Sequence, residues 1–265
     1  MLSGGTDSLG RNDGKRPAAA PEPDSREHHG PPRVTTNWQT RGMVYTGDVL
    51  VAGPSDVREL PDLTIRKASV SAQDNNAYLI TCAQTGEQLL IDAADDAPRL
   101  LRLVAEGSPD GPGNLGLVVT THQHWDHHRA LAEVVAATGA GTAAGRDDVS
   151  ALPVGIDHQL DDGDQIKIGR LNLEVAHLRG HTPGSVALVL ISSDGSRHVF
   201  TGDSLFPGGP GRTMTPENFT SLMDDLEARI FAPLPDSTWI YPGHGKDSTI
   251  GAERPHLAEW RQRGW

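Results

Sequence analysis

A dense cluster of metal-ligand side chains follows one apolar segment of this chain. Residues 115–120 have the apolar character of a buried strand, and Thr121-His122-Gln123-His124-Trp125-Asp126-His127 comes directly after them. A strand that ends in such a run points its side chains at one place beyond the sheet edge. Nitrogen and oxygen ligands of this kind suit zinc, and equally iron or manganese, whereas unpaired they would be costly to bury. The cluster therefore predicts a metal site on a sheet-based fold rather than a solvated, His-rich loop.

Three further candidate ligands follow, each after a strand-like run and each beside glycine. They are His181 in Gly180-His181-Thr182, Asp203 in Thr201-Gly202-Asp203, and His244 in Gly243-His244-Gly245. Glycine permits the backbone angles and the close approach that a crowded site requires. Any one of the three alone would be read as a surface residue. In this order after the first cluster, they favour a metal site.

Together, these seven positions resemble the signature of the metallo-β-lactamase superfamily, the binuclear hydrolases with an α+β four-layer αββα sandwich. The signature is H-x-H-x-D-H followed by separated His, Asp and His, and the resemblance runs from about Ala77 to the C-terminus. It implies two sets of three ligands for two metals, with one bridging carboxylate. The first set is His122, His124 and His181; the second is Asp126, His127 and His244; the bridge is Asp203.

The same resemblance implies a mechanism and a cofactor. Two divalent metal ions close together need a shared anion to offset their repulsion, which Asp203 supplies, and water between them becomes acidic enough to attack at neutral pH. The implied reaction is attack of a metal-bridged hydroxide on a thioester or ester carbonyl. Asp126 is expected to be catalytic, because it is placed to orient the nucleophile and accept its proton. Zinc is the first expectation for the metals, with iron or manganese as alternatives.

The surroundings of Asp203 are similar to the glyoxalase II branch of the superfamily. Thr201-Gly202-Asp203-Ser204-Leu205-Phe206 and the run Asp74-Asn75-Asn76-Ala77-Tyr78 both match that group. True metallo-β-lactamases typically carry Cys or Ser at the Asp203 position, and flavodiiron oxygen reductases carry Glu at that of His124. The implied partner is a small-molecule thioester or ester, including a conjugate of a thiol carrier.

Two basic residues are candidates for substrate contact, and each has a plain surface role as its alternative. Arg212 follows Asp203 in a position where glyoxalase II enzymes carry a basic residue that meets the carboxylate of the thiol carrier. The alternative is an arginine that stabilises a turn. Lys246 lies two residues after His244 and is a candidate for attracting an anionic substrate, with simple solvation as its alternative.

Several departures from glyoxalase II concern the substrate rather than the metals. Only about twenty residues follow His244, which leaves no room for the helical extension that helps to bind glutathione. Gly245 and Lys246 stand where glyoxalase II has a tyrosine, and His128-Arg129-Ala130 replaces a small-residue turn. This compact type looks like glyoxalase II-like hydrolases of actinobacteria, whose thiol carrier is mycothiol.

Other activities stay open beside the thioester hydrolase. Persulfide dioxygenases share the fold and bind a single iron through the first three histidines and the Asp203 position. Their G-x-G-R-T sequence is matched in part by Gly209-Pro210-Gly211-Arg212-Thr213, although Pro210 replaces a cysteine and Met214 an acidic residue. Lactonases and other ester hydrolases use the same hydroxide attack. A binding module without catalysis would require a missing ligand, and none is missing.

Composition bounds the domain organisation and the partners. Residues 1–42 mix Gly, Pro, Ser and charges, which predicts a disordered tail, whereas residues 43–265 suffice for one metallo-β-lactamase-like hydrolase domain. A net charge of -12 disfavours nucleic acid as a partner. The absence of a long apolar run argues against membrane insertion, and the single cysteine, Cys82, fits a reducing cytoplasm. Oligomeric state is not constrained by the sequence.

Apolar periodicity predicts the order of strands and helices around the candidate ligands. The expected turns are Asp162-Gly163 and Asp194-Gly195, both as hairpins, and Thr215 is the expected N-cap of the last long helix. Strands followed by a helix occur twice along the chain. This order predicts two sheets between layers of helices, with the metal site along one edge. Strands are expected near 77–81, 88–92, 115–120, 165–168, 172–176, 186–191 and 198–200, and helices near 96–104, 130–137 and 216–230.

Asp92 is a candidate for a supporting role at the metal site. It stands at the end of the apolar run Leu89-Leu90-Ile91, before the expected helix at 96–104. A ligating histidine usually donates its second N–H to a carboxylate or carbonyl, which Asp92 can provide. The alternative is a turn residue or the N-cap of the helix.

Overall fold

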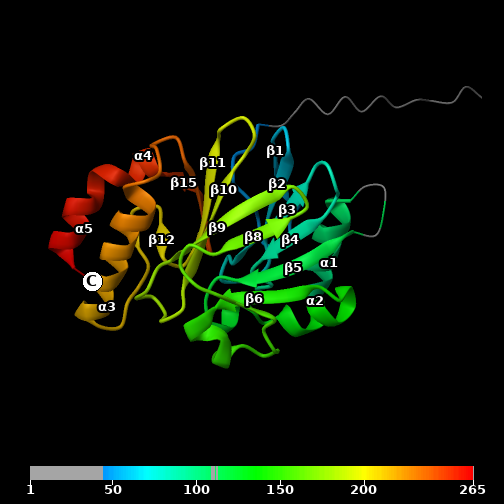
Figure 1. Ribbon diagram of the computed structural model, residues 1–265, viewed down its shortest axis with the longest axis horizontal. Helices are drawn as coiled ribbons and strands as arrows, with labels where there is room; N and C mark the ends of the chain where they lie inside the picture. The colour runs from blue at the N-terminus through cyan, green and yellow to red at the C-terminus, as the bar shows by residue number, and fades with distance from the viewer. Residues whose placement is uncertain (1–43, 109–110, 112, 265) are drawn as a thin grey trace, which may run out of the picture. The chain divides into compact units, whose positions relative to one another are not determined.

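In the computed structural model, two sheets pack face to face and helices cover the outer face of each (Figure 1). The structure describes residues 44–108, 111 and 113–264. The predicted disordered tail, residues 1–42, lies outside the described residues. Within them, no helix combines the length and the apolar character needed to cross a membrane.

The first sheet contains seven strands in the order of the sequence. β1 to β4 pair antiparallel, and β4 to β7 pair parallel, so that the loops after β5 and β6 leave from the same edge. The strands are β1 Asp56–Glu59, β2 Leu63–Ser69, β3 Asn76–Cys82, β4 Gln88–Ile91, β5 Leu115–Thr120, β6 Gly141–Gly145 and β7 His158–Leu160.

The second sheet contains six strands in the order β15-β14-β11-β10-β9-β8. Its neighbours are antiparallel except for the parallel pair β11 and β14, and a two-stranded ribbon, β12 with β13, stands beside it. The strands are β8 Gln165–Ile168, β9 Leu171–His177, β10 Val186–Ile191, β11 Arg197–Gly202, β12 Leu205–Phe206, β13 Gly209–Pro210, β14 Trp239–Pro242 and β15 Ser248–Thr249.

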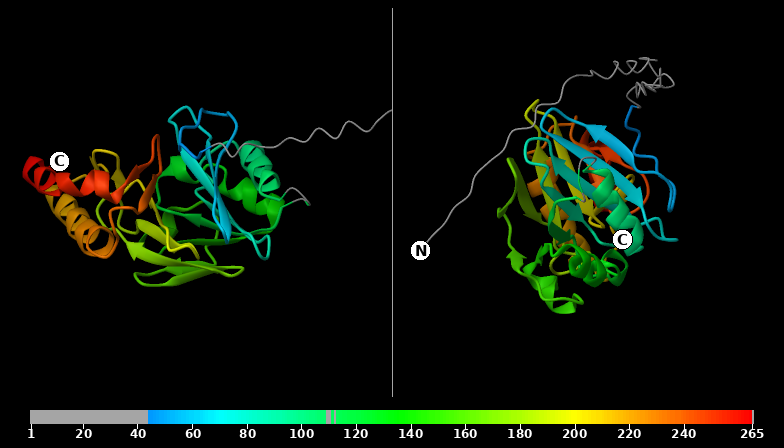
Figure 2. Two further views of the ribbon diagram at one scale, coloured as in Figure 1. Left: turned by 90° about the horizontal axis from the view of Figure 1, so that it is seen from above. Right: turned by 90° about the vertical axis from the view of Figure 1, so that its right-hand side faces the viewer.

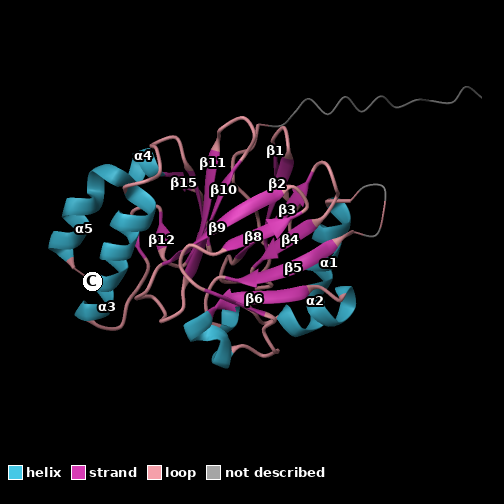
Figure 3. Cartoon of the chain, in the orientation of Figure 1, coloured by secondary structure: helices cyan, strands magenta, loops and turns pink. Residues whose placement is uncertain are grey.

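Helices form the two outer layers. Figure 3 shows them in cyan on both sides of the strands, and Figure 2 shows the same layers from two further directions, coloured along the sequence. α1 and α2 pack on the first sheet, and α3, its continuation η3, α4 and α5 pack on the second. The helical segments are α1 Ala97–Glu106, η1 Trp125–His127, α2 Leu131–Thr138, η2 Arg146–Ala151, α3 Pro216–Leu226, η3 Glu227–Phe231, α4 Ile250–Glu253, η4 Arg254–His256 and α5 Leu257–Arg263.

Three apolar clusters hold these layers together and confirm the predicted αββα sandwich. The central cluster joins the inner faces of the sheets, with Ile80 and Leu89 from the first and Leu173 and Leu188 from the second. The outer clusters join each sheet to its own helices. Burial of apolar surface at three interfaces is the main force that fixes the order of the layers.

The last long helix begins where the sequence predicts. The Thr215 hydroxyl accepts from the Asn218 N–H, and Pro216 occupies the first turn, where a missing N–H does no harm. The apolar side chains of Phe219, Leu222, Leu226 and Ile230, which recur at helical spacing, are buried against the second sheet. The α-helical part ends at Leu226, and the π-helical η3 carries Ile230 to the sheet.

One expected hairpin turn is present and the other is wrong. Asp194-Gly195 joins β10 and β11, with Gly195 at a φ of 86°. Asp162-Gly163 instead lies where the chain passes from β7 in the first sheet to β8 in the second. The turn between β8 and β9 is at Gly169, with a φ of 56°. A local Asp-Gly signal marks a turn but does not say which sheet the next strand joins.

His198, buried between β10 and β14, makes unfolding depend on pH. It is 1% exposed, and its ring nitrogens lie 3.0 Å from the Tyr241 hydroxyl and 3.1 Å from that of Ser196. Burial, and then the nearby Arg58 charge, lowers its pKa from 6.5 to about 4. Between pH 6.5 and 4, His198 is therefore protonated in the unfolded chain but neutral in the folded chain. The free energy of unfolding falls as the pH falls through this range, by up to about 3 kcal/mol.

The matching prediction is that His198→Gln reduces the loss of stability between pH 6.5 and 4. Glutamine retains hydrogen-bonding groups but has no proton to gain. Urea unfolding at several pH values measures the slope, and His256→Gln, an exposed position, should leave the wild-type slope unchanged. Equal slopes for wild type and His198→Gln would contradict a neutral, buried His198.

Candidate metal centre

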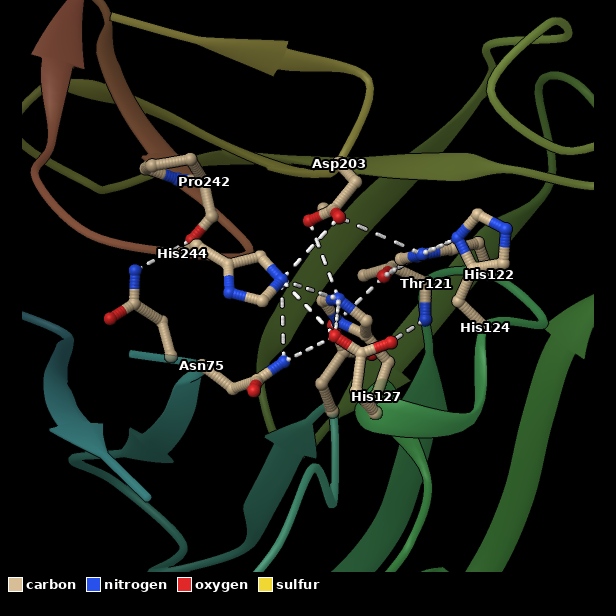
Figure 4. A network of polar contacts seen from close by, with 12 residues as sticks. Asn75, Thr121, His122, His124, His127, Asp203, Pro242 and His244 are labelled. Atoms are coloured by element: carbon tan, nitrogen blue, oxygen red, sulfur yellow. Dashed lines mark hydrogen bonds and ion pairs between the residues drawn. The ribbon is translucent and has the colours of Figure 1, made fainter. Parts of the chain in front are cut away.

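All seven predicted ligands lie in the segments that follow the strands at one edge of the sandwich. Figure 4 labels His122, His124, His127, Asp203 and His244. Four of the seven follow β5 in the short segment that includes η1, and His181 lies between β9 and β10. Asp203 follows β11 and His244 follows β14, the two parallel neighbours of the second sheet. Both sheets therefore contribute to one cluster, although its members are separated by more than a hundred positions in the sequence.

The cluster divides into two triads that can each hold a metal ion. The ligand atoms of His122, His124 and His181 lie within 4.8 Å of one another, and so do those of Asp126, His127 and His244. These sets are called the first triad and the second triad below.

Asp203 lies between the two triads. Its Oδ1 is 3.4 Å from His127 Nε2, and its Oδ2 is 3.7 Å from His181 Nε2 and 3.4 Å from His244 Nε2. It also forms a third possible metal-binding group with His122 and His127. The carboxylate therefore faces both triads at once.

Two buried atoms in the cluster have no hydrogen-bond partner among the described residues. They are His181 Nε2 and Asp203 Oδ1, which lie 3.7 Å from Asp203 Oδ2 and 3.4 Å from His127 Nε2, respectively. Leaving such atoms unpaired in a protein interior is costly, and a bound cation would satisfy both. Five imidazoles and two carboxylates are the donor set that divalent metals take, so the residues present fit metal ions.

Backbone carbonyls fix the orientation of two imidazoles. His181 Nδ1–H donates to the Arg212 carbonyl at 2.7 Å, and His244 Nδ1–H donates to the Gln73 carbonyl at 2.8 Å. Each bond places the hydrogen on Nδ1 and leaves the Nε2 lone pair directed at the centre. This is the arrangement that a ligating histidine needs.

Asp92 supports His127 in the same way, as the sequence suggested. Its Oδ2 accepts from His127 Nδ1–H at 2.8 Å and from the Thr121 hydroxyl at 2.8 Å, while Oδ1 accepts from the Thr121 N–H at 2.7 Å. The residue is buried and has a φ of 59°. The alternative role as helix N-cap belongs to Asp96, which accepts from the Arg99 N–H.

The charges of the metal-free centre are set by its carboxylates. Burial would raise the pKa of Asp203, but His127 and His244 beside it hold that pKa well below the usual range. Burial would likewise lower the pKa of His127, yet Asp203 and Asp92 raise it to about 10. Burial lowers the pKa of His122 well below its ordinary value. A metal ion therefore has to replace a proton on His127 but not on His122.

Asn75 is a site residue to which sequence reasoning gave no role. Its side chain is fully buried, and Nδ2 donates to Asp126 Oδ2 at 3.1 Å and lies 3.3 Å from His244 Nε2. This hydrogen bond, opposing the effect of burial, lowers the pKa of Asp126. The available signal was the run Asp74-Asn75-Asn76, which indicated a family resemblance but no role for Asn75.

The two predicted substrate residues lie beside the centre with exposed side chains. The Arg212 carbonyl bonds His181, while its guanidinium points into solvent. Lys246 Nζ is 3.4 Å from Asp48 Oδ1, and both side chains are largely exposed. Among the described residues, neither side chain contacts a predicted ligand.

A hollow of about 440 Å³ adjoins the first triad and offers space for a substrate. Most of the residues that line the hollow are polar. The lining consists of Gln123, His124, Asp147, Arg179, Gly180, His181, Thr182, Pro183, Met214, Asn218 and Ser221.

Trp125, between His124 and Asp126 in the sequence, is 60% exposed, and the Arg129 guanidinium stacks on its ring at 3.6 Å.

Comparisons with known proteins agree with this geometry. Hydroxyacylglutathione hydrolase of Fuscovulum blasticum is 37% identical over 174 residues, which are 65% of this chain and 63% of that protein. The chain thus spans less than two thirds of the length of this curated relative. Among solved structures, ETHE1 from Myxococcus xanthus has a TM-score of 0.63 at 31% identity, covering 75% of this chain and 84% of that one. TTHA1623, solved in a di-iron-bound form, has a TM-score of 0.56 at 28% identity, covering 71% and 96%.

The family model of the metallo-beta-lactamase superfamily matches residues 70–244. That range contains Asn75, Asp92 and all seven predicted ligands. The fold, the order of the predicted ligands and the sequence similarity therefore all indicate the same family. The chain belongs to the metallo-beta-lactamase superfamily and is similar to its hydroxyacylglutathione hydrolases.

Proposed function

We propose that the protein is a binuclear metal-dependent hydrolase that cleaves a thioester, with an ester as the alternative substrate. The observation that carries this proposal is the pair of complete triads that share Asp203. The name of the hydroxyacylglutathione hydrolases and the di-iron form of TTHA1623 support it. Zinc is the expected metal, with iron or manganese as alternatives, and the cytoplasm is the expected location.

In this proposal, the first triad would hold one metal ion, the second triad would hold another, and Asp203 would contribute to both. The positions of the two Asp203 oxygens, one near His127 and the other near His181, support a bridge. When bound, the metals polarise the substrate carbonyl and make a bridging water acidic enough to attack it.

The side chains around the metals orient the reaction and carry its proton. Asp126 is held by Asn75, and its lowered pKa keeps it ionised and able to accept the proton of the attacking water. The hollow beside His124 and His181 receives the part of the substrate that extends beyond the carbonyl. Arg212, which follows the bridging Asp203 in the sequence, and Lys246, which follows His244, attract an anionic thiol carrier at the rim.

A mononuclear iron persulfide dioxygenase is the second candidate. The similarity to ETHE1 and the partial match at Gly209-Pro210-Gly211-Arg212-Thr213 favour it. It would use the first triad with Asp203 and leave Asp126, His127 and His244 without a metal. The departures at Pro210 and Met214 from the dioxygenase sequence are the reason that the hydrolase ranks first.

Metal analysis combined with two activity assays separates these candidates. Protein purified without a metal-binding tag is expected to contain close to two equivalents of metal per chain and to release thiol from S-lactoyl conjugates of small thiols. Thiol release is followed with a chromogenic thiol reagent. A single iron per chain, together with oxygen uptake on addition of a persulfide, would overturn the hydrolase in favour of the dioxygenase.

A further inference from the structure

Asp148 is a buried carboxylate outside the ligand set that joins the two loops of the first triad. It lies in η2 and is 0% exposed. Its Oδ2 accepts from the Gln123 N–H at 2.9 Å and from the Thr182 hydroxyl at 2.6 Å, and its Oδ1 accepts from the Gly184 N–H at 2.8 Å. A backbone N–H of each loop is thus bound to a different oxygen of one carboxylate.

These hydrogen bonds join segments that come from different sheets. Gln123 stands between His122 and His124, after a strand of the first sheet, and Thr182 follows His181 in a loop of the second sheet. The contact is close enough that a Cβ on Gly184 would lie 2.5 Å from the Asp148 nitrogen. Asp148 therefore sets the separation between His181 and the His122–His124 pair, without touching the site itself.

Lys67 is a buried group that binds the loop carrying His244, as Asp148 binds the loops of the first triad. It lies on β2 with 0% exposure, and Nζ donates to the Gly245 carbonyl at 2.7 Å, to the Gly47 carbonyl at 2.8 Å and to Asp247 Oδ1 at 2.6 Å. All three ammonium hydrogens are used. The residues that follow His244 are thus tied to the first sheet.

Asp247 completes this anchor. Its second oxygen accepts from the Tyr45 hydroxyl at 2.6 Å and from Trp239 Nε1 at 3.1 Å. A fully buried ion pair contributes little net stability after desolvation, but it fixes geometry because neither partner can be satisfied elsewhere. The Lys67–Asp247 pair therefore locates the loop after His244 rather than strengthening the fold as a whole.

We propose that Asp148 and Lys67 are positioning residues that control the two metal sites separately, Asp148 the first triad and Lys67 the second. The inference rests on the proposed binuclear function. It goes beyond that function because it assigns to each metal a buried group that does not ligate it. Groups that hydrogen-bond a ligand directly change metal affinity about 10- to 100-fold, and we expect an effect at the lower end of that range from groups that hold the ligand loops.

Asp148→Asn is the sharpest variant for the first triad. Its volume is unchanged, but one oxygen becomes an NH₂ group, which must face either the Gln123 N–H or the Gly184 N–H. Two donors then oppose each other, and one of the two loops loses its anchor. The matched control is Asp194→Asn, where the carboxylate also accepts from a backbone N–H and a hydroxyl, but in the hairpin turn between β10 and β11.

Lys67→Met removes the ammonium and keeps the buried stem. The single variant leaves Asp247 as an unpaired buried charge and can therefore misfold. The double variant Lys67→Met/Asp247→Asn removes that charge as well, and the asparagine oxygen still accepts from Tyr45 and Trp239. The matched control is Lys167→Met on the exposed face of β8.

The experiment titrates metal-free protein with Zn²⁺ against a chromophoric chelator and records imidazole NMR signals at one and two equivalents. Asp148→Asn is expected to weaken the zinc bound by His122, His124 and His181 about tenfold or more, while His127 and His244 keep their metal-bound signals. Both Lys67 variants are expected to show the reverse pattern. The controls should bind two zinc ions as the wild type does.

Two results would overturn the inference: wild-type affinities in both variants, or an equal loss at both sites in each. A wild-type protein that binds only one equivalent would instead contradict the binuclear function. In that case Asp148→Asn should still weaken the single metal and Lys67→Met should leave it unchanged, so failure of the inference and failure of the function remain distinguishable.

Discussion

Replacing Asp203 by asparagine is expected to lower the rate of thioester hydrolysis by a factor on the order of 10³, or about 4 kcal/mol of transition-state stabilisation. The Asp203 side chain is 13% exposed and lies within 4.0 Å of histidine nitrogens from both triads. Its negative charge is the one that both metal ions can share. An amide keeps the shape but loses the charge, so the two cations repel each other without compensation. Steady-state thiol release and metal content measure the effect.

The same substitution has a second readout that does not require metal. Asp203 and Asp92 together raise the pKa of His127 to about 10, so Asp203→Asn should lower that pKa in the metal-free protein. Titration of the His127 ring by NMR follows the change. Asp236→Asn serves as the control, because Asp236 is largely exposed and pairs with Arg254 instead of a predicted ligand. Near wild-type hydrolysis by Asp203→Asn with two bound metals would rule out a bridging role.

The clustering of the seven predicted ligands could be anticipated from the sequence, because each one follows a strand and lies beside a local signal. His181 and His244 stand next to glycines, and the first cluster ends an apolar run. The Asp92 contact could also be anticipated, since a carboxylate at the end of β4 lies beside the end of β5 in a parallel sheet. In such cases the pairing of two neighbouring strands in one sheet is enough to bring the residues at their ends together.

The supporting residues could not be found in this way. Asp148 binds Gln123 and Gly184 across two sheets, and Lys67 binds Gly245 at a separation of 178 positions. Nothing near either residue in the sequence distinguishes a buried partner from a solvated charge. β6, with the sequence Gly-Thr-Ala-Ala-Gly, was missed for a related reason: small residues give no apolar alternation, yet Gly145 packs so closely on Gly184 that a Cβ would lie 1.9 Å from its carbonyl oxygen.

Removing the metals with a chelator is expected to abolish hydrolysis and to lower the melting temperature by on the order of 10 °C or more. A ligand present at a thousand times its Kd stabilises the folded state by about 4 kcal/mol, and each kcal/mol shifts the melting temperature of a domain of this size by about 2–4 °C. The loops that carry the ligands come from both sheets, so metal ions cross-link the two halves of the sandwich.

Differential scanning calorimetry before chelation, after chelation and after return of Zn²⁺ tests this expectation. Metal-free protein should keep the same sheets, because the three apolar clusters involve none of the seven ligands. Recovery of both activity and melting temperature at two equivalents of Zn²⁺ would tie the stability to the same ions that serve the reaction. Asp203→Asn provides the internal control. Because this variant should bind metal more weakly, chelation should lower its melting temperature by less. An unchanged melting temperature would mean that the loops are held by protein contacts alone, with Asp92, Asp148 and Lys67 sufficient to form the centre before any metal arrives.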